Sequence, residues 1–253
     1  LLSYRSARTE LEDSEAWKEA ILLLEQVAVV GVLLRVSGWL LSLSAAWSVV
    51  IGAFAAAAMI LGNTGVARRK DAQGIWTASA TAHLGYLLLG VLVGGHFARA
   101  SVLFLAMAHT VSLAGFYTAA VSLGGGPWWS AVHRGLGWRR PHEATAATLC
   151  CLSLAGLPPL AGFIGRFFVL RAGTPDHLFL VSLGIALSLV GAVGYLRVPL
   201  ALWAPSPASP AASIPVGLGA RLSFVVTIAT LATMGLYPHP WVAMAQRIAV
   251  EFF

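Results

Sequence analysis

The chain is poor in charged residues. Only 10% of its 253 residues are Asp, Glu, Lys or Arg, and 58% are hydrophobic, whereas a typical soluble domain is about a quarter charged. Several apolar runs approach or exceed the roughly 20 residues that cross a bilayer as a helix. A water-soluble globular domain is therefore excluded in favour of a membrane protein. The net charge of +6 does not predict nucleic-acid binding, because the basic residues lie in short loops between apolar runs.

Cysteine and the common catalytic motifs are also scarce. The two cysteines, Cys150 and Cys151, are neighbours in an apolar run, so we expect packing residues rather than a disulfide framework or a metal site. The sequence contains no phosphate loop, CxxC pair, nucleophile elbow or dinucleotide fingerprint. Residues 1–18 mix both signs of charge, unlike a transit peptide or signal peptide. Because there is no initiator Met, we expect a processed or incomplete front.

The apolar runs predict an all-α polytopic membrane protein with about seven transmembrane helices. Residues 1–17 form a polar N-terminal segment, residues 18–239 the transmembrane bundle, and residues 240–253 a C-terminal interfacial segment. The expected spans are residues 18–42, 45–62, 76–95, 101–123, 145–171, 177–203 and 219–237. The second span is expected to end at Gly62-Asn63, before a polar loop.

The basic residues are distributed unequally between the two ends of the predicted bundle. The end that holds the N-terminus carries Arg5, Arg8, Arg68, Arg69, Lys70, Arg134, Arg139 and Arg140. The other end carries only Arg99, Arg171 and Arg247. Loops rich in Lys and Arg stay on the inner side of a membrane. We therefore expect the N-terminus to face the cytoplasm or the mitochondrial matrix.

The fifth predicted span is a broken helix with a charge just beyond the break. Pro158 and Pro159 lack backbone donors and clash with the preceding turn, so the helix should break near Gly156–Pro159. Broken backbone survives in a membrane only inside protein or beside water. Arg166 next to such a break indicates an ion or proton path. The alternative is that Arg166 extends its stem to the interface.

Four other polar residues in apolar runs are candidates for a proton path. His83 and His109 each lie inside a predicted span, where an imidazole can relay protons or simply bond a neighbouring helix. Glu25 and Gln26 lie in the first span, and Glu25 is the relay candidate of that pair. Arg197, near the end of the sixth span, is interpreted as structural.

Six segments in order resemble one family. They are VAVVGVLLR (27–35), MILGNTGVARR (59–69), SATAHLGYLLLG (79–90), LSLAGLPPLAGFIGRF (152–167), GYLRV (194–198) and MGLYPHP (234–240). Together they resemble the antiporter-like membrane subunits of respiratory complex I, and among them subunit N, called subunit 2 in mitochondria. The resemblance covers most of residues 20–240 and corresponds to the back half of the usual fourteen-helix subunit. It implies a five-helix unit with a broken helix, containing Gly156, Pro158, Pro159, Gly162 and Gly165.

The resemblance also implies where this chain departs from the family. A lysine of the eighth helix aligns with Gln26, beside Glu25, and a lysine of the broken twelfth helix aligns with Arg166. An arginine does not release its proton at accessible pH. His83 keeps the family's position. With His109 from the apolar-run reading, the proton-path candidates are Glu25, Gln26, His83, His109 and Arg166.

The resemblance implies a membrane-arm subunit of NADH:ubiquinone oxidoreductase, structural and able to contribute to proton translocation. The alternatives are a subunit of a sodium/proton antiporter complex and a purely structural subunit. No cofactor is expected in the chain; FMN, iron–sulfur clusters and ubiquinone belong to partner subunits, and lipids such as cardiolipin are expected. A separate polypeptide should supply the missing front half; the alternative is a natural truncation. The expected location is the mitochondrial inner membrane, with a bacterial plasma membrane as the alternative.

Overall fold

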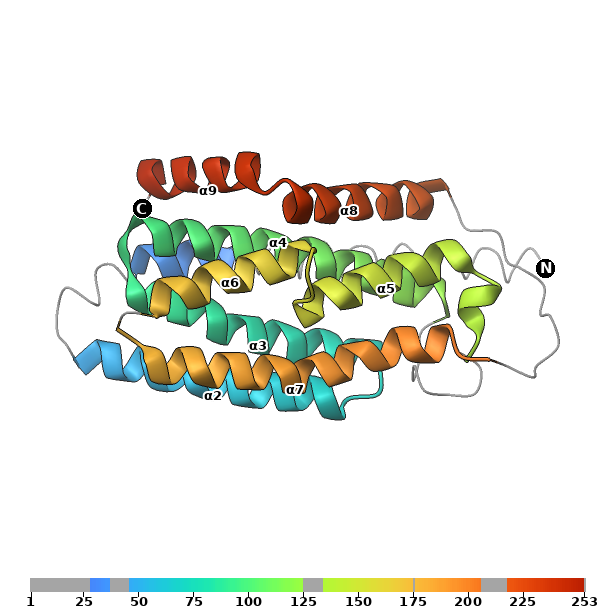
Figure 1. The fold of residues 1–253 in the computed structure, drawn as a ribbon, viewed down its shortest axis with the longest axis horizontal. Coiled ribbons are helices and arrows are strands. Elements are labelled where there is room, and N and C mark those ends of the chain that lie inside the picture. The colour runs from blue at the N-terminus through green and yellow to red at the C-terminus, as the bar shows by residue number, and fades with distance from the viewer. Residues whose placement is uncertain (1–27, 37–45, 125–133, 175, 206–217, 253) are drawn as a thin grey trace.

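The computed structural model describes residues 28–36, 46–124, 134–174, 176–205 and 218–252. Residues 28–36 are helical and fall within the expected first span, but Glu25 and Gln26 lie outside the described residues. The elements of the described part of the chain are helices, which confirms the expected all-α class. The helices run along one long axis (Figure 1).

The helices pack in layers (Figure 1). Their bounds are α2 Ala46–Arg68, α3 Ala72–Val93, α4 Gly95–Ser122, the 3-10 helix Leu136–Trp138, α5 Pro141–Ala155, α6 Ala161–Gly173, α7 Leu178–Leu202, α8 Leu218–Leu236 and α9 His239–Phe252. Helices α2, α3 and α7 contact one another on one side, α4, α5 and α6 lie in the middle, and α8 and α9 cover the opposite side. The middle layer thus holds both pieces of the predicted broken helix.

Several helices have the length and apolar character of membrane spans. Within the described residues, α2, α3, α4 and α7 are each long and apolar enough to cross a bilayer, which makes the chain a multi-pass membrane protein. A bent pair, Arg221–Leu236 with His239–Phe252, adds a fifth candidate if it counts as one span; its two parts meet at 86°. Helices α5 and α6, with 15 and 13 residues, are individually shorter than a span.

The expected end of the second span at Gly62-Asn63 is wrong, because α2 continues to Arg68. Asn63 does not cap the helix. Its amide nitrogen instead donates to the carbonyl of Met59 at 2.9 Å, one turn earlier, and a methyl group at Gly62 would clash with the backbone of Ala82 on α3. Glycine here permits close helix packing, as small residues do in membranes.

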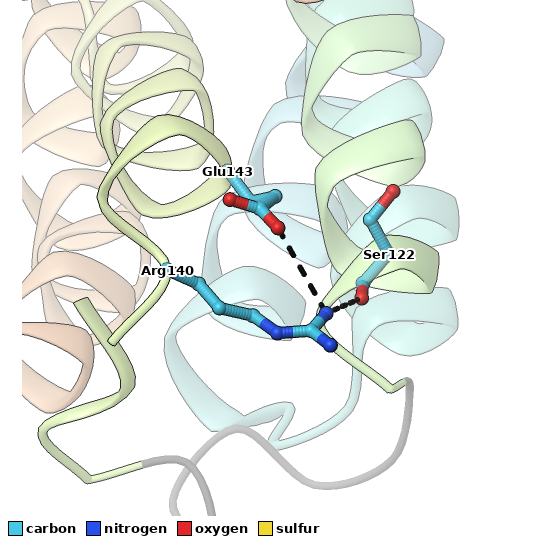
Figure 2. A network of polar contacts seen from close by, with 3 residues as sticks. All are labelled: Ser122, Arg140 and Glu143. Atoms are coloured by element: carbon cyan, nitrogen blue, oxygen red, sulfur yellow. Dashed lines mark hydrogen bonds and ion pairs between the residues drawn. The ribbon is translucent and has the colours of Figure 1, made fainter. Parts of the chain in front are cut away.

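Arginines at the basic end of the bundle bind the C-termini of helices. Arg140 donates to the carbonyl oxygen of Ser122, the last residue of α4, at 2.5 Å, and lies 3.8 Å from Glu143 Oε1 (Figure 2). Arg197 donates to the carbonyl of Ala67 near the end of α2 at 2.5 Å. Helix ends leave such carbonyls without intrahelical partners. The contact agrees with the structural role expected for Arg197.

Candidate functional site: a buried polar network at the helix break

Residues 156–160 interrupt the helix where the sequence predicts the break. Gly156 has φ +78° and ends α5, and Leu157 N–H donates back to the carbonyl of Leu152 at 3.1 Å. This is the usual glycine termination of a helix, which leaves other terminal carbonyls available. The break lies near the middle of the bundle's long axis (Figure 1).

Helix α8 lies directly against this break. A methyl group built on Gly235 of α8 would clash with the carbonyl oxygen of Pro159 and with Leu160. The backbone of the break is therefore packed against the C-terminal helices without an intervening side chain.

Arg166 points from α6 into this break. Its guanidinium donates to the carbonyl oxygens of Leu154 and Ala155, the latter at 2.9 Å, which are two of the carbonyls that the end of α5 leaves free. Only 5% of its surface is exposed. The alternative in which Arg166 extends to the interface is therefore wrong. The arginine closes the break from inside the protein.

His83 on α3 receives the third contact of the guanidinium. Arg166 Nη2 lies 3.3 Å from His83 Nε2, and His83 Nδ1 lies 3.0 Å from the carbonyl oxygen of Ser79. A guanidinium only donates and a carbonyl only accepts. We therefore assign the hydrogen to Nδ1, so that Nε2 accepts from Arg166 and the ring is neutral.

His109 on α4 extends the network toward α7. Its ring stacks on that of His83, with centroids 3.7 Å apart and an interplanar angle of 25°. His109 Nε2 lies 3.2 Å from Ser79 Oγ. The same hydroxyl accepts a hydrogen bond from the Tyr195 hydroxyl at 2.6 Å. Arg166, the histidine pair, Ser79 and Tyr195 thus form one continuous buried chain across α6, α3, α4 and α7, here named the Arg166 network.

Three further contacts lie around this network. The Tyr86 ring lies against the guanidinium of Arg166, 5.3 Å from ring centre to Cζ. Ser153 Oγ of α5 accepts from the backbone N–H of Gly162 at 3.1 Å and from the Ser112 hydroxyl at 2.8 Å. The two halves of the broken helix are therefore joined by a serine bond as well as by Arg166.

The structure brings together three of the five proton-path candidates, His83, His109 and Arg166. Gly162 and Gly165 provide close approaches, because a methyl group at either would clash, with the Ser153 carbonyl and the Leu105 backbone respectively. The sequence analysis missed Ser79 and Tyr195. Ser79 precedes His83 by one helical turn, but its link to Tyr195 spans 116 residues and leaves no sequence signal.

The chain matches a known protein family over most of its length. Residues 16–191 match a family model described as "NADH:quinone oxidoreductase/Mrp antiporter, TM". A protein from Desulforamulus reducens named NADH-quinone oxidoreductase subunit N is 29% identical over 208 residues, covering 81% of this chain and 44% of the relative. A protein of the same name from Heliobacterium modesticaldum is 31% identical over 210 residues, with 82% and 44% covered.

Solved structures share the fold. A chain of the membrane-bound sulfane sulfur reductase, an archaeal respiratory membrane complex, superposes with a TM-score of 0.76 at 20% identity, covering 90% of this chain and 46% of that one. A chain of the Mrp complex from Dietzia gives 0.72 at 18%, covering 81% and 47%. A chain of respiratory complex I from Thermus thermophilus gives 0.70 at 23%, covering 81% and 44%.

The chain spans a little under half the length of these curated relatives. The family match nevertheless covers most of its residues, including α3, α4, and the break with its arginine. The chain therefore belongs to the NADH:quinone oxidoreductase/Mrp antiporter transmembrane family, and it is homologous to subunit N of NADH-quinone oxidoreductase.

Proposed function

We propose that the chain is a membrane-arm subunit of a proton-translocating NADH:quinone oxidoreductase, corresponding to the back half of subunit N. The supporting observation is the Arg166 network, because it places a fixed cation and two histidines at a helix break inside a multi-pass bundle. Buried ionisable groups at such breaks are typical of ion and proton paths. The NADH and quinone chemistry belongs to partner subunits, together with FMN and the iron–sulfur clusters.

The proposal includes about seven spans. In that arrangement α5 and α6 count as one broken span, α8 as another, and the first span surrounds the helical residues 28–36. A second polypeptide supplies the front half of the fold, and anionic lipids such as cardiolipin occupy the surface. The relatives named above are bacterial, which favours a bacterial plasma membrane over the expected mitochondrial inner membrane.

The proteins that copurify with the chain test this proposal. The tagged chain is purified from its native membranes in mild detergent, and its partners are identified by mass spectrometry. We expect flavin-binding and iron–sulfur subunits, other membrane-arm subunits, and a small chain bearing the missing front half. If the chain is purified without any electron-transfer subunit, the proposal is wrong.

A subunit of a sodium/proton antiporter complex is the second candidate. It is favoured by the likeness to a chain of the Mrp complex from Dietzia, with a TM-score of 0.72. The GFIGRF and GYLRV segments favour the respiratory subunit instead. The same purification distinguishes the two, because an antiporter complex would lack electron-transfer subunits.

A purely structural subunit is the third candidate, motivated by Gln26 and Arg166 standing where the family has lysines. The double variant Gln26→Lys with Arg166→Lys addresses it directly. More protons moved per NADH by the variant complex than by the unmodified one would indicate that the natural chain has lost pumping. An unchanged value would not support a loss of pumping.

A further inference from the structure

Helices α8 and α9 meet at a second helix break, which lies at the depth of the first. Gly235, near the end of α8, is so close to Pro159 and Leu160 that a methyl group there would clash with both. The first break lies near the middle of the bundle's long axis, and Figure 1 shows that α8 and α9 meet there as well. Residues 236–240, here named the α8–α9 junction, therefore lie near the centre of the membrane.

The backbone of the α8–α9 junction lacks two of its helical hydrogen bonds. An α-helix would bond the carbonyls of Met234 and Leu236 to the N–H groups four residues later. Those residues are Pro238 and Pro240, which have no N–H. Leu236 and Pro240 are exposed on this chain. Because broken backbone is costly in hydrocarbon, it persists in a membrane only against protein or water.

Polar side chains are exposed at the same junction. Tyr237 is 66% exposed, His239 is also exposed, and their ring centroids lie 6.5 Å apart. Neither side chain forms a hydrogen bond with the described part of the chain. The centre of a membrane is about 15 Å from either interface, which is too far for a tyrosine hydroxyl to reach the headgroups. A histidine within a membrane almost always faces protein or a water-filled cavity.

The rest of the exposed surface of α8 has no such need for cover. Its large exposed hydrophobic side chains before the junction are Leu222, Val225 and Val226. Thr233 is exposed, but its hydroxyl donates to the carbonyl of Thr230 on its own helix at 3.0 Å. Lipid tails suit these residues, because none of them requires a hydrogen bond from outside the helix. The unmet polar groups are thus concentrated at the junction.

We propose that the α8–α9 junction is an interface at which a transmembrane helix of another subunit packs against this chain. This inference rests on the proposed function only for the presence of partner subunits. The Leu236 carbonyl requires a donor and the Tyr237 hydroxyl an acceptor. The partner helix therefore presents a neutral amide or hydroxyl side chain, which can supply both, at the centre of the membrane.

Photocrosslinking in the assembled complex tests whether protein covers the junction. p-Benzoylphenylalanine replaces Tyr237 in the full chain, the native membranes are irradiated, and the adducts are identified by mass spectrometry. We expect an adduct with a membrane helix of another subunit. The same variant, purified alone in lipid nanodiscs, is the control and should form lipid adducts. Lipid adducts alone in the complex, or adducts only with a second copy of this chain, would overturn the inference.

Deletion of one hydroxyl tests the polar character of the partner helix. Tyr237→Phe keeps the ring, and the fraction of the chain that dissociates from its partners in mild detergent should rise about threefold to tenfold, as expected for the loss of one hydrogen bond between membrane helices. Thr233→Val is the matched control, because it removes an exposed hydroxyl that is already bonded within α8. It should leave dissociation unchanged. Equal dissociation of the two variants would overturn the proposed hydrogen bond to the partner.

Failure of this inference can be distinguished from failure of the proposed function. If residue 237 crosslinks to another subunit in a complex without electron-transfer subunits, the interface is confirmed and the proposed function is wrong. If electron-transfer subunits copurify with the chain but residue 237 crosslinks only to lipid, the interface is overturned and the proposed function is retained.

Discussion

Arg166 combines two duties at the scale of a single residue. It supplies donors to carbonyls that the end of α5 leaves free, and it sets the tautomer of His83. A lysine could carry the same charge, but its ammonium lacks the planar fork that reaches two carbonyls and an imidazole together. Compared with a lysine at this position, the arginine cannot release a proton, but it can bond the free carbonyls at the break.

Replacing Arg166 should destabilise the chain. Arg166→Met leaves the Leu154 and Ala155 carbonyls unpaired, and each buried unpaired group costs about 1–3 kcal/mol. Arg166→Lys should cost less, because the ammonium retains the charge and part of the bonding. The measurement is thermal unfolding of the chain in nanodiscs, followed by tryptophan fluorescence.

Arg171→Met is the control for this series, because Arg171 is an exposed arginine on the same helix whose described contact is with the Phe97 ring. Its change should stay within about 1 kcal/mol. Similar losses for Arg166→Met and Arg171→Met would show that the buried contacts of Arg166 contribute little.

The sequence predicted the residues of the site only in part. A charge or an imidazole inside an apolar run is conspicuous, so His83, His109 and Arg166 could be found without coordinates. Ser79 and Tyr195 could not, because hydroxyl residues are tolerated throughout membrane helices and their role depends on a contact between α3 and α7. The tautomer of His83 likewise depends on partners that only the fold supplies.

At the scale of the elements, glycines determine how closely the helices approach. Gly162 lies in the first turn of α6, where its N–H donates to Ser153 Oγ and its α-carbon faces the Ser153 carbonyl. The two halves of the broken helix can therefore overlap side by side at the break. A side chain at residue 162 would separate them and lengthen the contacts of Arg166.

Gly162→Ala should destabilise the chain by about 1–3 kcal/mol, as overpacking does in a tight core. Gly31→Ala is the matched control, because Gly31 is helical and a methyl group there meets nothing within 4 Å. It should be neutral or stabilising by about 0.5–1 kcal/mol, since alanine is the better helix former. Unfolding of both variants in nanodiscs checks this, and equal effects would contradict the close packing at the break.

Two other glycines explain why the sequence misplaced one helix boundary and located another. Gly62-Asn63 has the composition of a helix end, yet Gly62 lies against α3 and Asn63 bonds inside its own helix. Local composition cannot distinguish a glycine that ends a helix from one that admits a neighbour. Gly156 is the easier case, because Pro158 and Pro159 follow it and prevent the helix from continuing.

The whole molecule has a basic end and a poorly charged end, and helix α3 runs from one to the other. With 22 residues α3 is about 33 Å long at 1.5 Å per residue, which matches the roughly 30 Å of a bilayer core. The exposed residues Lys70 and His96 lie just beyond its two ends. The charge bias predicts that Lys70 lies on the inner side.

Cysteine labelling tests this orientation. In spheroplasts, a membrane-impermeant maleimide should label His96→Cys and not Lys70→Cys, and inverted vesicles should give the reverse. The unmodified chain is the background control, because both natural cysteines are buried. Labelling of both positions from the same side would contradict the predicted topology.

The contact between Gly235 and Pro159 has a consequence for how α8 and the break can move. Because backbone meets backbone there, no flexible side chain separates the two segments. A displacement of α8 toward the break would therefore press on the segment that leads, within seven residues, to Arg166. The position of α8 and the position of the buried charge are thus mechanically linked.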